Sequence, residues 1–146
     1  MAIATYTASS QTATPKANHV GLTVAKGTFT LNGAASYSAS DVVLFVKIPN
    51  GAWIIDGYIN GTAGDTATIF KLGTAADDDL ATAAATISTA AAQHNRFDGA
   101  VLPFKVSLSD DAVPQWTWLK GEIVSVGSSS VTMSVQVTVM YTMQGL

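Results

Sequence analysis

The chain has 146 residues, enough for one ordinary domain that buries roughly two-thirds of the surface its unfolded form exposes. It contains no cysteine, which excludes disulfides, thiolate metal sites and thiol nucleophiles. The net charge is -3 and the seven Lys and Arg residues are scattered, so the sequence lacks the cationic stripe that nucleic-acid binding requires.

The expected organisation is an N-terminal arm over residues 1–18 and a single β-sandwich domain over residues 19–146. The arm is rich in Thr, Ala and Ser and has too few large apolar groups to become ordered alone. It is either a disordered tail or an extended arm that uses Ile3 and Tyr6 as apolar anchors on a neighbouring subunit or an underlying lattice. No signal-peptide pattern and no apolar run of about eighteen residues is present, so neither Sec export nor a membrane span is expected.

Eight strand-like segments follow at short spacing, and turn-forming residues separate them. These segments are 20–30, 42–48, 53–60, 66–72, 101–108, 113–120, 122–126 and 131–142. The pattern predicts an all-β fold, an antiparallel sandwich or a barrel.

Three of these segments carry the clearest information. In 131–142, every second residue is apolar, so one face enters a core and the other meets water or a neighbouring subunit. Segment 42–48 is apolar at nearly every position, which predicts a strand that is covered on both faces or that meets another subunit. A turn joins it to 53–60, and these two segments are expected to form the centre of the fold.

Residues 75–93 can be interpreted in two ways. Their alanines and the acidic start at 77–79 favour a helix. Several threonines and Ile87 lower the helix propensity, and strands flank the segment on both sides. We favour an extended excursion at the edge of the sandwich with one helical turn.

No catalytic, cofactor or metal site is expected. The acidic triplet 77–79 lacks the further ligands of a calcium loop and is interpreted as a solvated turn or a helix cap. His19 and His94 lie in unrelated segments, without a spacing that directs both to one metal. No G-x-S-x-G motif presents a nucleophilic serine, so an enzyme is not expected.

Trp116 and Trp118 are the best candidates for ligand contact because alternate residues of a strand share one face. Such a pair could form a sugar-stacking platform or the centre of a protein interface. Packing of both rings in the core is the alternative.

The low charge content favours a component of an assembly. Charged residues make up 12% of the chain, whereas roughly 25% is typical of a soluble domain. A surface of small uncharged polar residues can pack closely against copies or partners. The alternative is a compositional habit of a secreted or alanine-rich source.

Two segments, Ile48 to Gly57 and Thr68 to Asp77, together resemble small virion proteins of tailed bacteriophages. The shared pattern is a hydrophobic strand, I-P-x-G-A, a second strand and an L-G-T-A-A-D turn, and the similarity covers about residues 42–142. The resemblance implies a jelly-roll-like capsid decoration, or cement, protein. Such a protein is expected on the outer capsid surface, bound to the major capsid protein across capsomers as a homotrimer, with no cofactor, nucleic acid or membrane.

On this hypothesis, deletion of residues 1–15 weakens binding to the lattice without unfolding the domain. A carbohydrate-binding or adhesin module of a tail or head fibre is the main alternative, with Trp116 and Trp118 as the stacking platform. A different structural component of the same particle is the third interpretation.

Overall fold

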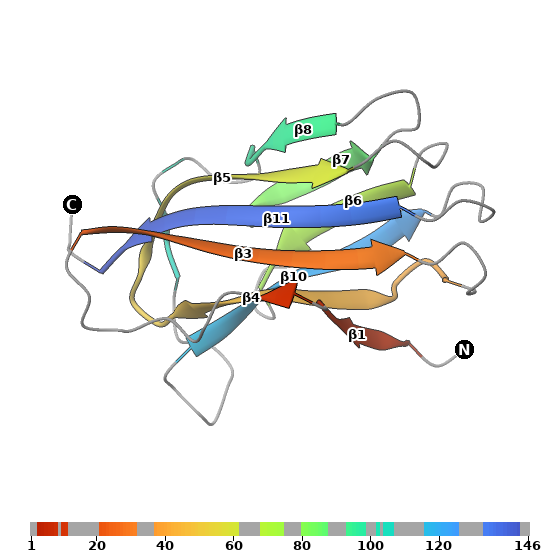
Figure 1. Cartoon of the computed structure of the whole chain (residues 1–146), viewed down its shortest axis with the longest axis horizontal. Coiled ribbons are helices and arrows are strands. Elements are labelled where there is room, and N and C mark those ends of the chain that lie inside the picture. Colours follow the sequence, from red (N-terminus) through yellow and green to blue (C-terminus); the bar gives the residue numbers. More distant parts are fainter. Residues whose placement is uncertain are drawn as a thin grey trace.

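The structure is a computed structural model that describes residues 3–8, 10–11, 21–31, 37–61, 68–74, 80–87, 93–98, 102, 104–106, 116–125 and 133–143. Within these residues it contains eleven strands and no helix, arranged as two packed sheets (Figure 1). The strands are β1 (Thr5–Thr7), β2 (Ser10–Gln11), β3 (Leu22–Leu31), β4 (Val42–Pro49), β5 (Trp53–Gly61), β6 (Thr68–Gly73), β7 (Thr82–Ile87), β8 (Gln93–Arg96), β9 (Phe104–Lys105), β10 (Trp116–Ser125) and β11 (Met133–Thr142). The predicted all-β sandwich is confirmed.

The strand order is that of a jelly roll. Sheet A has the order β1-β4-β10-β6-β7, and sheet B has the order β2-β3-β11-β5-β8, with β9 also on β5. Without the short β1, β2 and β9, eight strands remain, and the first of these pairs with the last, β3 with β11. The other antiparallel pairs, β4 with β10, β5 with β8 and β6 with β7, continue this inward order. Two four-stranded sheets with this nesting form a double-sheet jelly roll.

The core lies between the two sheets, and β11 supplies its centre in sheet B. Val135, Val137, Val139 and Tyr141 are all buried, as the period-two pattern predicts. From sheet A, Phe45 of β4 and Phe70 of β6 are fully buried, and their rings pack edge to face. Apolar residues of the two inner faces therefore hold the sheets together.

A β-bulge in β4 explains why two consecutive residues of this segment, Phe45 and Val46, are both buried and apolar. Leu119 pairs with Val46 and Lys120 pairs with Leu44, so Phe45 has no partner on β10. One extra residue reverses the alternation of side chains beyond it. Both Phe45 and Val46 are therefore buried, although they are consecutive in the sequence.

The segments 42–48 and 53–60, predicted to form the centre of the fold, both supply buried core residues, but they lie in different sheets. The turn between them is a corner at which the chain leaves sheet A and enters sheet B, so β4 and β5 have different partners. In this corner Ala52 donates its N–H to the carbonyl of Pro49, and Gly51 has a φ of 85°. Glycine adopts that left-handed conformation without steric cost.

Residues 116–120 and 122–125, predicted to belong to two separate segments, form one strand, β10, which continues through Gly121. A side chain at Gly121 would place its Cβ 2.7 Å from the ring of Phe45 and 3.1 Å from that of Phe70. This glycine therefore makes space for two core aromatics and does not mark a turn.

The ambiguous segment 75–93 contains a strand. Residues 82–87 form β7, which pairs with β6 and ends the order of sheet A. This agrees with an excursion at the sandwich edge, while 75–79 and 88–92 lie outside the described residues. Within the candidate strand 101–108, the residues that the structure describes as paired with β5 are Phe104 and Lys105, which form β9.

The first residues of the chain pair with both sheets. β1 runs parallel to β4 at one edge of sheet A, and β2 runs antiparallel to β3 at the corresponding edge of sheet B. Between them, Ala8 is buried and donates its N–H to the carbonyl of Leu44. The segment therefore connects the two sheets on the side where β3 and β4 lie.

The buried carboxylate of Asp41 holds this segment in place. Its Oδ1 accepts the N–H of Ala4 at 3.0 Å, and its Oδ2 accepts the N–H of Ser38 at 2.9 Å. The side chain is 4% exposed. Because hydrogen bonds to a charged acceptor are stronger than neutral ones, this carboxylate stabilises the start of β1 against the turn that precedes β4.

We expect the substitution Asp41→Ala to lower the free energy of unfolding by about 2–4 kcal/mol, since it leaves two backbone N–H groups without their acceptor. Asp41→Asn keeps one carbonyl acceptor and should cost clearly less. Urea denaturation of the three proteins measures the difference. Equal midpoints for wild type and Asp41→Ala would contradict the role given to the carboxylate.

Candidate functional site

The outer face of sheet A carries the candidate site. On β10, Leu119, Gly121 and Ile123 are buried, so the alternate residues point away from the core. The outward set on this strand consists of Trp116, Trp118, Lys120, Glu122 and Val124. Both tryptophans are therefore half-buried at the surface and are not part of the core.

A lysine from the neighbouring strand completes the tryptophan pair. The Nζ of Lys47 lies 4.7 Å from the ring centroid of Trp116 and 5.2 Å from that of Trp118. Cation–π attraction operates at these distances, within about 6 Å. We refer to Lys47, Trp116 and Trp118 as the Trp–Lys cluster.

The β4 bulge is the reason that Lys47 belongs to this cluster. Without the extra residue at Phe45, the alternation that buries Val43 would also direct Lys47 inward. With the bulge, Lys47 lies opposite Trp118 on the outer face. Bulges commonly redirect a side chain in this way.

Most of the charged side chains that the structure describes on this face are basic. Lys120 lies two residues beyond Trp118, and Lys71 on β6 lies opposite Glu122. The Nζ of Lys71 is 3.4 Å from the Oε1 of Glu122. Glu122 therefore offsets one lysine, and the face keeps an excess of positive charge.

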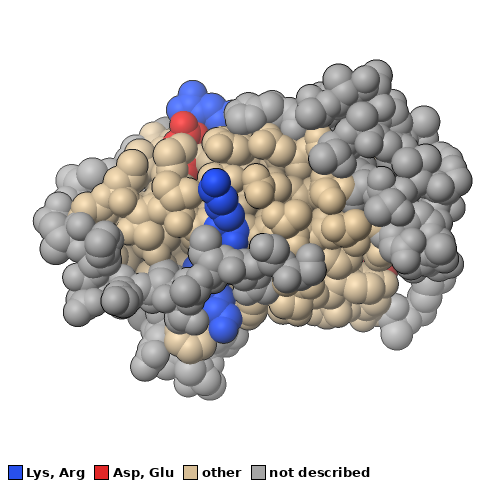
Figure 2. Space-filling model, viewed as in Figure 1, with Lys and Arg blue, Asp and Glu red and all other residues tan. Residues whose placement is uncertain are grey.

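The outer face of sheet B carries a second, apolar surface. Leu22 is 58% exposed and Val24 is 45% exposed. In the strand register, Val24 lies opposite half-buried Met140, and Leu22 lies in one row with half-buried Trp53 across β11. Sheet B faces the reader in Figure 1, and Figure 2 shows few charges on this side of the molecule. We refer to Leu22, Val24, Trp53 and Met140 as the apolar patch.

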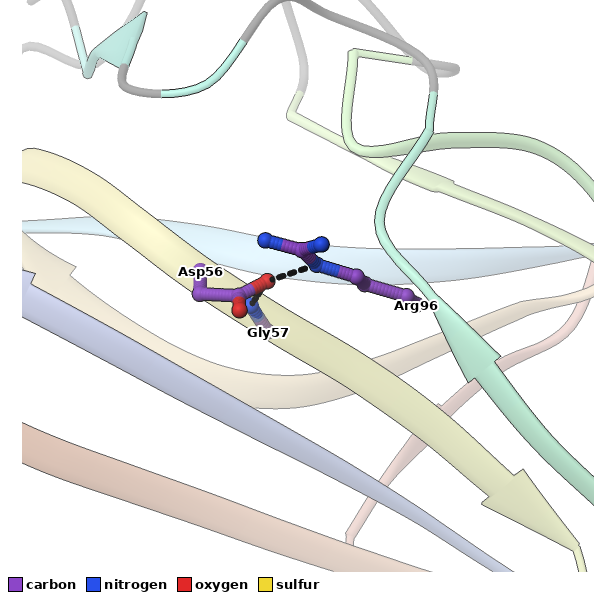
Figure 3. A network of polar contacts seen from close by, with 3 residues as sticks. All are labelled: Asp56, Gly57 and Arg96. Carbon is purple, nitrogen blue, oxygen red and sulfur yellow. Dashed lines mark hydrogen bonds and ion pairs between the residues drawn. The ribbon is translucent and has the colours of Figure 1, made fainter.

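An exposed ion pair joins β5 and β8 on the same side of the molecule (Figure 3). The Nε of Arg96 donates to Asp56 Oδ1 at 2.9 Å, and the N–H of Gly57 donates to the same oxygen at 2.8 Å. The hydrogen bond to Asp56 raises the pKa of Arg96. Because the arginine is mostly exposed, the pair is an edge contact of small energy and not a reactive group.

Tyr6 and Ile3 have different environments. Tyr6 packs on its own domain, with ring centroids 5.6 Å from Phe29 and 5.3 Å from Tyr37. Burial and the nearby carboxylate of Asp41 raise the pKa of the Tyr6 hydroxyl, so it stays neutral. Ile3 is 64% exposed and remains available for contact with another chain.

The four residues that sequence reasoning singled out do not form one site. Tyr6 lies opposite Val43 near the start of β4, whereas Trp116 lies opposite Pro49 at its end, so about 20 Å of strand separates them. The two tryptophans do lie together. Sequence reasoning missed Lys47, because its place beside them depends on the bulge.

Neither a metal centre nor a membrane-spanning helix is found in the described parts of the chain. Those residues contain no group of three or more His, Cys, Asp or Glu side chains placed to hold an ion. Among the same residues, no helix has the length and hydropathy to cross a membrane.

No family model matches the chain, and no curated protein matches it in sequence. Its fold is similar to chains in three solved phage capsid structures. A chain of the cyanophage Pam1 capsid asymmetric unit aligns with a TM-score of 0.68 and 19% identity, over 93% of this chain and 95% of that one. A chain of the capsid of Ralstonia phage GP4 aligns with a TM-score of 0.63 and 15% identity, over 92% of this chain and 93% of that one. A chain of the acidic stable capsid structure of Helicobacter pylori bacteriophage KHP30 aligns with a TM-score of 0.55 and 13% identity, over 86% of this chain and 91% of that one. At these identities the likeness shows a shared fold.

Proposed function

We propose that the chain is a structural protein of a bacteriophage virion that decorates the outer surface of the capsid and stabilises it. The observation that carries the proposal is the fold shared with chains of three phage capsid structures. The alignments cover at least 91% of each of those chains, so the likeness extends to whole small chains and not to one domain of a larger subunit. This favours an accessory component over the shell-forming subunit.

The proposed mechanism is the burial of surface across boundaries between capsomers. When one protein contacts several copies of the major capsid protein, loss of a shell subunit must break many weak contacts together. A sandwich with two outer faces that expose side chains suits this task. One face can meet the shell while the other meets further copies of the chain.

The proposed oligomer is a homotrimer. The apolar patch on sheet B supports self-association, because large apolar groups that stay exposed on a monomer are typical of contact surfaces. Closed cyclic symmetry buries the same patch in every copy. Light scattering after size-exclusion chromatography should give a mass of three chains over a range of concentrations, and a persistent monomer would contradict the trimer.

Capsids that lack the protein provide the direct test. We expect purified chain to co-sediment with such capsids to a saturating stoichiometry and to raise the temperature at which they release DNA. Heat-unfolded chain is the matched control and should stay in the supernatant. Absence of co-sedimentation would contradict the proposal, and antibody labelling on tails alone would assign the chain to another part of the particle.

The carbohydrate-binding alternative rests on the two surface tryptophans. The Lys47 ammonium group lies over both rings, so a stacked sugar would compete with it for the aromatic faces. This arrangement favours contact with a protein. Binding to a glycan array that disappears in Trp116→Ala would reverse the preference.

A further inference from the structure

Basic and acidic residues are distributed differently in this chain. Six of the seven basic residues lie on strands, namely Lys26, Lys47, Lys71, Arg96, Lys105 and Lys120. Of the acidic residues that the structure describes, Asp56 and Glu122 lie on strands, whereas Asp41 and Asp98 do not. The described strands therefore carry more basic than acidic residues, even though the net charge of the chain is -3.

Among the described residues, the two outer faces carry a similar excess of positive charge and differ in what surrounds it. On sheet B, Lys26, Lys105 and Arg96 accompany Asp56, which pairs with Arg96, and exposed Leu22 and Val24 dominate one end of the face. On sheet A, three lysines accompany one glutamate, and the ammonium group of one of those lysines lies over two tryptophan rings. Aromatic rings next to cations are the side chains that most often contribute strongly at protein interfaces.

We propose that the outer face of sheet A, centred on the Trp–Lys cluster and Lys120, is the surface that docks on the shell, and that the shell surface it meets is acidic. The inference rests on the proposed function and adds the face and the chemistry of the partner. Carboxylates of the shell protein pair with Lys47 and Lys120, while the tryptophan rings pack beside them and exclude water. The tryptophan rings beside the lysines distinguish this face from that of sheet B. Charge complementarity supports an acidic partner, since a basic face fits an acidic surface and repels a basic one.

The geometry also explains why the contact does not require the domain to change shape. Lys47 is fixed by its position opposite Trp118, and the bulge that directs it outward is anchored by the buried ring of Phe45. Both charged groups belong to the paired strands β4 and β10. Preorganised side chains lose less conformational entropy on binding.

Charge reversal on the two faces tests the proposal. Lys47→Glu and Lys120→Glu change the outer face of sheet A, and Lys26→Glu is the matched control on the outer face of sheet B. All three residues lie outside the core, and circular dichroism checks that each variant folds. Binding to capsids that lack the protein is measured by co-sedimentation at low and high salt.

We expect each sheet A variant to bind at least tenfold more weakly than wild type, and the Lys26→Glu control to bind within twofold. Wild-type binding should weaken as salt rises, and the variants should show a smaller salt dependence. Two results with binding wild-type protein would contradict the docking face: weaker binding of Lys26→Glu alone, or wild-type binding by all three variants. In either case the proposed function stands. If wild type does not bind capsids at all, the proposed function fails.

Discussion

Replacing Gly27 with alanine is expected to lower the free energy of unfolding by at least about 3 kcal/mol, or to prevent folding. A Cβ at this position would lie 2.0 Å from the carbonyl oxygen of Phe45 and 3.1 Å from a methyl group of Val46. The first obstacle is backbone, which cannot rotate away as a side chain can. β3 would have to move away from β4, and the two sheets would separate along that side.

A control on the same strand isolates the steric effect. Lys26→Ala changes the adjacent, exposed residue and should leave the urea midpoint nearly unchanged. If Gly27→Ala also unfolds at the wild-type midpoint, the sheets do not approach each other as closely at this corner as the structure indicates.

Deletion of residues 1–11 is expected to cost about 3 kcal/mol of stability in addition to any loss of lattice binding, because it removes a half-buried aromatic and two short strands. Tyr6 leaves the cluster with Phe29 and Tyr37, and Asp41 loses the N–H of Ala4. The strands at the centre of both sheets remain, so the truncated protein should still fold cooperatively. Urea denaturation and limited proteolysis measure the two effects.

Two point variants separate stability from binding in this segment. Tyr6→Ala should reproduce most of the stability loss. Ile3→Ser changes an exposed residue and should lower capsid occupancy without changing the urea midpoint. An unchanged midpoint for the truncated chain would mean that β1 and β2 contribute nothing to the domain and that the segment acts only as a binding arm.

The all-β class of the fold can be predicted from the sequence where apolar and polar residues alternate along a strand. β11 alternates without interruption, and Val135, Val137 and Val139 are buried as expected. In β4 the alternation breaks at Phe45 and Val46, and the sequence alone does not say which residue is the additional one. That depends on the register with β10, which lies far along the chain.

Gly121 is a second position whose role depends on distant residues. Gly121 resembles a turn signal, yet it lies within a strand because two core rings occupy the space of its side chain. The candidate site shows the same limit. Spacing alone predicts that Trp116 and Trp118 share one face. Lys47, which contacts both rings, comes from another strand and faces outward because of the bulge.

The central place of β11 also bears on how the chain folds. This strand lies between β3 and β5, and its pairing with β3 joins residues more than a hundred positions apart, as for Thr30 and Ser134 at a separation of 104. Closing such long loops before any contact stabilises them makes folding slow. During synthesis, β3 and β5 therefore wait with unpaired edges until residues 133–142 are made, and this interval is when the chain is most prone to aggregate.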